Sequence, residues 1–132
     1  MSEEKKDLNK NEMTEEELNK IAGGKFTSDI FLENIRVTKY AYDVVKGHTF
    51  ACGIKVNQKY TNCVCAVSND LLKIFPFYSR IIVSEFSEFH QLTVFDTVAG
   101  HNRIEIFCLS RKEVSEWGTK FCNVKNVIKL DS

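Results

Sequence analysis

The 132-residue chain is predicted to be mainly β, a compact β-barrel with one or two short helices. Short apolar segments with the period-two alternation of strands follow one another from residue 35 onward. Hydrophobic residues make up 43% of the chain and ten of them are Phe, which is enough for a packed core. A single Pro and the lack of low-complexity runs exclude a disordered chain.

Four expected strands come first. Ile35–Tyr42 alternates apolar and polar residues, and Thr61–Val67 does so more loosely. Arg80–Phe86 and Gln91–Phe95 are apolar runs separated by polar residues, and we expect them to be the arms of a hairpin. Many short strands of this kind favour a barrel over an α/β sheet.

The C-terminal part adds two strands and a helix. Arg103–Phe107 is a short apolar strand. Ser110 and Glu113 form a capping box that opens a short helix through Trp117, and the glycine that follows is a natural stop. Lys120–Leu130 is then expected to be the closing strand.

The first 24 residues differ in composition from the rest. They contain seven acidic residues, four lysines and no aromatic residue, a net charge of −3, whereas the remaining 108 residues carry +3. Thr14 as N-cap and Glu17 as its capping-box partner predict a short helix that ends at Gly23. An ordinary surface helix is one interpretation of this segment.

The other interpretation is an export signal. The segment resembles the double-glycine leader of peptides exported by peptidase-containing ABC transporters. The matching residues are Met13, Glu17, Leu18 and Ile21, followed by Gly23 and Gly24. The resemblance implies cleavage after Gly24 by such a transporter and a location outside the cell or in the cell envelope of a bacterium. Residues 25–34 are expected to be a connector between this segment and the strands.

Several classes of partner are not expected. No apolar run is long enough to span a membrane, and a charge of +3 does not indicate nucleic acid. The cysteines and histidines show no pair of ligand-spaced motifs, so we expect no metal and no cofactor. Two states remain possible for the five cysteines: free thiols in a cytosol, or up to two disulfides after export. These cysteines are Cys52, Cys63, Cys65, Cys108 and Cys122.

Asp96 and Glu105 put two carboxylates near the facing ends of two apolar strands joined by a short polar loop. Burying a polar group without a partner costs roughly 2–7 kcal/mol, so acids in such strands are expected to be paired, hydrogen-bonded or placed at a cleft. Two carboxylates held close together can differ in their affinity for a proton, and one of them can then act as a general acid. The alternative is that both flank a hairpin and face water.

A succession of short motifs runs through most of the chain. They are Val37–Tyr40, His48–Gly53, Cys65–Leu72, Phe75–Ile81, Val94–Thr97, Asn102–Phe107 and Glu113–Gly118. In this order they resemble the three-aspartate (3D) domain, the double-psi β-barrel of membrane-bound lytic transglycosylase A and of many secreted cell-wall proteins.

The resemblance implies a six-stranded double-psi β-barrel over residues 35–130 that acts on peptidoglycan glycan strands. In that family one acid protonates the glycosidic oxygen and then takes the proton of the hydroxyl that closes a 1,6-anhydro ring. By position, Asp70 corresponds to the first acid, with Ser68 as an alternative, and Asp96 to the second. Glu105 stands where the third, catalytic aspartate is expected.

Two departures from the family leave the activity open. Glu105 replaces an aspartate, and misplacement of a catalytic group by ~1 Å can cost on the order of 10²-fold in rate. The loop between Asp96 and Glu105 is also shorter than the family's. The alternative is therefore a catalytically inactive barrel that binds cell wall or a partner protein. The leader-like segment suggests a further alternative, a bacteriocin-like exported effector.

Other polar residues could serve the same site. His48, His101 and Asn102 are candidates for binding sugar, and loop surface is the other interpretation of the histidines. Arg103 could neutralise Glu105, but strand alternation is expected to point it away. Four aromatic residues could stack on sugar rings but are expected to pack in the core or at its rim: Tyr40, Tyr42, Tyr78 and Trp117.

Overall fold

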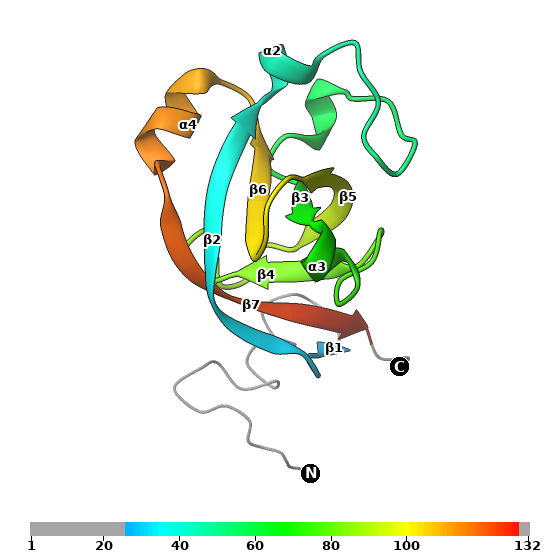
Figure 1. Cartoon of the computed structure of the whole chain (residues 1–132), viewed down its shortest axis with the longest axis vertical. Helices are drawn as coiled ribbons and strands as arrows, with labels where there is room; N and C mark the ends of the chain where they lie inside the picture. Colours follow the sequence, from blue (N-terminus) through cyan, green and yellow to red (C-terminus); the bar gives the residue numbers. More distant parts are fainter. Residues whose placement is uncertain (1–25, 130–132) are drawn as a thin grey trace.

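A closed six-stranded β-barrel forms the body of the protein in a computed structural model that describes residues 26–129 (Figure 1). The segment predicted to be a leader, with the expected cleavage residues Gly23 and Gly24, lies outside the described residues. The elements are β1 (Phe26–Thr27), β2 (Phe31–Ala41), α2 (Tyr42–Val45), η1 (Gln58–Tyr60), β3 (Val64–Ser68), α3 (Asn69–Leu72), β4 (Arg80–Val83), β5 (Leu92–Val98), β6 (Arg103–Cys108), α4 (Arg111–Trp117) and β7 (Lys120–Lys129).

The strands are hydrogen-bonded in the order β7-β2-β6-β3-β5-β4, and pairing of β4 with β7 closes the barrel. Strand β1 adds to β7 outside this ring. The pairs β2–β6 and β3–β5 are parallel, and the other pairs are antiparallel. The predicted mainly-β class is confirmed, and the closed six-stranded barrel is compatible with a double-psi fold.

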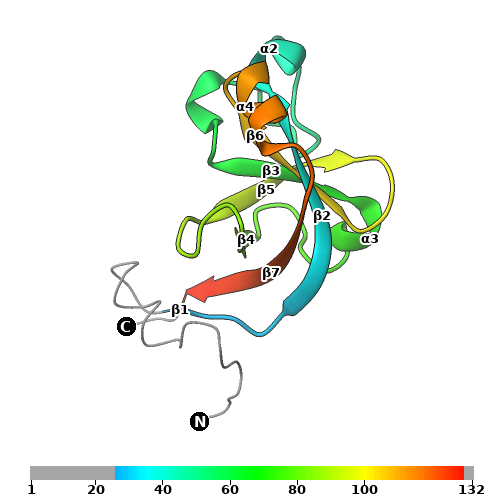
Figure 2. The same ribbon diagram turned by 90° about the vertical axis from the view of Figure 1, so that its left-hand side faces the viewer.

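Each expected strand is present, with shifted ends. The pairing of Arg80 with Thr93 and of Ile81 with Leu92 confirms that β4 and β5 are antiparallel neighbours. Strand β2 begins at Phe31, so β1 and the start of β2 lie within the expected connector 25–34. At one end of the barrel lie α2 and α4, and β1 lies at the other (Figures 1 and 2).

Helix α4 follows the capping signals. The Ser110 hydroxyl accepts a hydrogen bond from the Glu113 backbone N–H at 3.3 Å, and Gly118 follows the helix with φ +68°. The Trp117 indole N–H donates to the Val37 carbonyl at 3.0 Å, which joins the end of α4 to β2. The predicted helix and both of its ends are confirmed.

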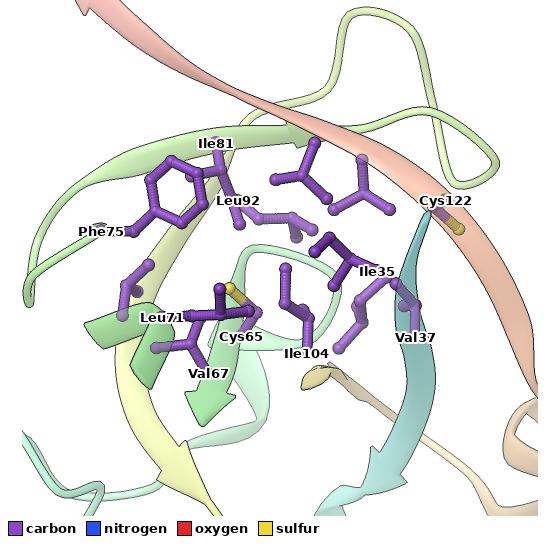
Figure 3. Packing of buried hydrophobic residues seen from close by; sticks show 14 residues of the cluster. Ile35, Val37, Cys65, Val67, Leu71, Phe75, Ile81, Leu92, Ile104 and Cys122 are labelled. Carbon is purple, nitrogen blue, oxygen red and sulfur yellow. The ribbon is translucent and has the colours of Figure 1, made fainter. Parts of the chain in front are cut away.

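The barrel interior is filled by the inward-facing side chains of the strands (Figure 3). Residues spaced two apart along the strands, such as Cys65 and Val67 or Ile104 and Ile106, are fully buried there. Leu71 and Phe75, from α3 and the turn after it, are also buried in this core. Burial of these side chains is the main term that stabilises the barrel.

A second apolar cluster lies on the outer face of β6, β3 and β5. We call it the outer aromatic cluster, and it contains Phe50, Val64, Phe95 and Phe107, with Tyr40 and Tyr60 against it. The segment 46–63, which connects β2 to β3, covers these strands from outside. Its backbone is attached by hydrogen bonds from the Cys52 N–H to the Phe95 carbonyl and from the Asn62 N–H to the Phe107 carbonyl.

Candidate functional site

Four residues lie side by side across four neighbouring strands. Thr38 of β2 pairs with Glu105 of β6, Glu105 with Ala66 of β3, and Ala66 with Asp96 of β5. We call these four residues the acidic row. Neighbouring strands are about 4.8 Å apart, so the Cα atoms of the two acids are separated by roughly 10 Å. Only the Ala66 methyl group lies between them in the row.

A β-bulge puts Asp96 on the outer face. Val94 points into the core, and strict alternation would send Asp96 inward as well. Cys65 pairs with Val94 but Ala66 pairs with Asp96, so Phe95 is an extra residue on β5. The bulge directs Phe95 into the outer aromatic cluster and aligns Asp96 with Ala66. The two acids therefore share one face of the barrel.

The Asp96 carboxylate accepts two hydrogen bonds from the protein. The Tyr40 hydroxyl donates to Oδ2 at 3.2 Å, and the Ala51 backbone N–H donates to Oδ1 at 2.9 Å. Burial, and after it the charge of Asp96, raises the pKa of Tyr40 far above its ordinary value. Tyr40 therefore stays protonated and donates to Asp96. The Ala51 bond fixes the covering segment over the row.

Glu105 is held by one residue of the neighbouring strand β2 and by one residue of its own strand. The Thr38 hydroxyl donates to Oε2 at 3.1 Å, and the Arg103 guanidinium forms an ion pair with the same oxygen at 3.0 Å. The side chains of Arg103 and Glu105 are each 22% exposed. The expectation that Arg103 points away was wrong, because residues two apart on a strand share a face. Arg103 also donates to the Ala99 carbonyl in the β5–β6 loop.

Asp70 lies outside the acidic row, in α3. Its two carboxylate oxygens accept from the Asn102 backbone N–H at 3.0 and 3.2 Å. A hydrogen bond with the Ser68 hydroxyl, and then the bond from Asn102, hold the pKa of Asp70 below its ordinary value. Asp70 thus ties α3 to the loop that precedes β6.

Ser68, the alternative to Asp70 in the resemblance, is part of the same connection. It is 0% exposed, and its hydroxyl accepts from the Arg103 backbone N–H at 3.0 Å. Arg103 thus contacts Ser68 through its backbone and Glu105 through its side chain. The structure brings Asp96 and Glu105 into one row and links Asp70 to that row indirectly, through Ser68, Asn102 and Arg103.

The expected sugar-binding residues lie on exposed loops. His48 is in the covering segment, and His101 and Asn102 are in the loop between β5 and β6. Within residues 26–129, neither of these histidine side chains has a hydrogen bond. Asn102 is held through its backbone, with φ +59°. The structure does not bring the three residues into the acidic row.

Sequence reasoning missed Thr38 and the Ala51 N–H, and it expected Tyr40 to pack at the core or its rim. Thr38 and Tyr40 lie two apart on a strand, so alternation places them on one face, which was the available signal. The Ala51 contact has no sequence signal, because it joins a loop backbone to an acid that is 45 residues away.

All five cysteines are thiols in the structure, and three of them are buried: Cys65, Cys108 and Cys122. Cys65 projects into the core, where burial, and then the charge of Asp96, raises its pKa well above the ordinary value. These buried thiols act as small apolar side chains of the core.

Comparisons of the chain with protein-family models and with curated proteins found no match. Within residues 26–129, no cluster of His, Cys, Asp and Glu side chains is arranged to hold a metal ion. Among the described helices, none is long and apolar enough to cross a membrane.

Proposed function

We propose that the protein is a cell-wall-acting barrel that cleaves peptidoglycan glycan strands without water, with Glu105 as the acid and base. The acidic row is the observation that carries this proposal. Ala66, between the two carboxylates, is buried, but Asp96 and Glu105 are partly exposed on one face, so their oxygens are acceptors within reach of a polysaccharide strand. Carboxylates are strong acceptors for the hydroxyl groups that a sugar presents.

The proposed reaction uses one carboxyl group in both directions. Glu105 gives a proton to the glycosidic oxygen while the bond from that oxygen to the sugar C1 breaks. The C6 hydroxyl of the same sugar then bonds to C1, and Glu105 takes up its proton. Thr38 orients the Glu105 carboxyl group, and Asp96 accepts hydrogen bonds from hydroxyls of a neighbouring sugar. The Arg103 side chain must leave Glu105 before the proton can be loaded.

A second candidate function is glycan binding without cleavage. The ion pair between Arg103 and Glu105 favours it, because the guanidinium lies 3.0 Å from Glu105 Oε2, which the Thr38 hydroxyl also contacts, so this oxygen is already occupied. Asp96 likewise has two donors from the protein already. Such a barrel would use the acidic row as a fixed set of acceptors.

The deciding experiment is digestion of purified glycan strands, followed by mass spectrometry of the products. The wild-type chain should release fragments with 1,6-anhydro ends, and Glu105→Gln should release none. Glu88→Gln removes an exposed carboxylate outside the row and should behave as wild type. Strands that are bound but left intact would favour the second function. A chain that neither binds the strands nor releases products would exclude both functions.

Export belongs to the same proposal. We infer that residues 1–24 direct the chain to a peptidase-containing transporter, because of the double-glycine pattern that ends at Gly24. The mass of the exported form should then correspond to a chain that begins at Lys25. An exported form that retains Met1 would contradict this.

A further inference from the structure

Tyr78 is an exposed aromatic residue that packs on Phe95, the residue next to Asp96 in β5. Its side chain is 58% exposed, yet it is held in place. Its backbone N–H donates to the Val94 carbonyl at 2.8 Å, and its ring meets Phe95 edge-on, with centroids 5.9 Å apart. Its hydroxyl lies 3.5 Å from the Cys52 carbonyl oxygen. The backbone of Tyr78 is fixed by one hydrogen bond, and its side chain is positioned by two contacts before any ligand binds.

The backbone of Tyr78 is unusual as well. Its φ is +74°, in the left-handed region that is unfavourable for a bulky side chain and open to glycine. The turn itself would accept a glycine with less strain. The aromatic side chain is therefore not required by the turn, and only a minor part of it is buried.

The contacts of Tyr78 place it at the Asp96 end of the acidic row. Phe95, on which its ring packs, directly precedes Asp96. Cys52, which its hydroxyl contacts, follows Ala51, whose N–H donates to Asp96. The aromatic ring of Tyr78 therefore contacts the sequence neighbours of Asp96 and of its donor Ala51.

We propose that Tyr78 is a stacking platform for one sugar ring of a glycan that binds at the Asp96 end of the acidic row. A pyranose ring has an apolar face of C–H groups that packs on an aromatic ring, while its hydroxyls project sideways as donors. An exposed aromatic ring that packs beside the strand carrying Asp96 suits this chemistry, and a ring that is already fixed loses little conformational freedom on binding. The inference rests on the proposed glycan ligand but not on cleavage.

Calorimetry tests the inference by measuring how tightly the full chain binds a soluble β-1,4-linked N-acetylglucosamine oligomer. Tyr78→Gly removes the ring and suits the left-handed backbone, so the variant should remain folded. Its Kd should rise on the order of tenfold, the loss typical of one stacked aromatic ring. Tyr78→Phe keeps the ring and should bind within about twofold of wild type by the same scale.

Phe121→Ala is the matched control, because Phe121 is 60% exposed on β7, outside the outer aromatic cluster. It should bind as wild type does. Unchanged affinity in Tyr78→Gly, an equal loss in Phe121→Ala, or a wild-type chain that binds neither the oligomer nor purified glycan strands would overturn the inference. Thermal unfolding verifies that each variant is folded.

The outcome is separable from that of the cleavage proposal. A wild-type chain that binds the oligomer without cleaving glycan, and that loses binding in Tyr78→Gly, would support the platform and contradict catalysis. A chain that cleaves glycan equally well with and without the Tyr78 ring would support catalysis and contradict the platform.

Discussion

At the scale of single residues, the acidic row shows how two carboxylates are kept on an apolar barrel surface. Asp96 receives one hydroxyl and one backbone N–H, and Glu105 receives one hydroxyl and one guanidinium. Each acid therefore has two donors, which offset part of the cost of removing it from water. Thr38 and Tyr40, the hydroxyl donors, come from the same strand, so β2 orients both acids.

The Tyr40 hydroxyl should contribute measurably to stability. Tyr40→Phe removes a half-buried donor to a carboxylate and should lower the free energy of unfolding by about 1–3 kcal/mol. Tyr42→Phe is the control, because Tyr42 packs on Phe107 without a hydrogen bond from its hydroxyl within the described residues. Urea denaturation of the two variants measures the difference. Equal losses would show that the Asp96 contact adds nothing to stability.

At the scale of elements, local sequence signals were sufficient to predict an element whose ends are fixed by neighbouring residues. The capping box of α4 and its terminal glycine act over a few residues, and they were recognised without tertiary contacts. The bulge in β5 is the opposite case. It is specified by the pairing of β5 with β3, which is distant in sequence, and no turn residue marks it.

The α4 cap yields a prediction for this scale. Ser110→Ala removes the acceptor for the Glu113 N–H and should destabilise the protein by about 0.5–2 kcal/mol. Ser115→Ala lies on the exposed side of the same helix and should be neutral or slightly stabilising, because Ala is the better helix former. Thermal unfolding of both variants gives the comparison. A Ser115→Ala loss as large as that of Ser110→Ala would contradict the capping role.

At the scale of the whole molecule, stability depends on closure between segments that are far apart in sequence. The β4–β7 pairing completes the ring, and the Asp70–Asn102 contact ties α3 to the β5–β6 loop across 32 residues. This contact is charged, so part of the stability of the fold should depend on pH.

Acid should weaken the Asp70 contact. The folded pKa of Asp70 lies below its ordinary value of about 3.9, so the unfolded chain binds the proton first as the pH falls. The stabilisation is complete above that value and is lost as the pH drops through the lower, folded pKa. Asp70→Asn should therefore show a shallower loss of unfolding free energy below pH ~4 than wild type. Identical slopes in denaturation series at several pH values would contradict this.

The barrel class, all six of its strands and the capped helix could be predicted from the sequence. Hydrophobic periodicity and capping are local properties, and apolar residues of the expected strands, such as Val67 and Ile104, are buried. The candidate acids Asp96 and Glu105 were also found this way, because charged residues in apolar strands are conspicuous. Their partners Thr38 and Ala51 were not, since those contacts depend on strand pairing.

Only the tertiary structure decided how these residues meet. The bulge at Phe95 turned Asp96 out of the core and into line with Glu105, whereas alternation along β5 alone would have pointed it inward. The hydrogen bond that Asp70 of α3 accepts from the Asn102 N–H ties this helix to the β5–β6 loop, although the position of Asp70 in the chain suggested a third acid of the site. The sequence by itself determined the barrel, its helix and its two acids, because period and caps are read along the chain. Register, which is set between strands, decided which face the acids share.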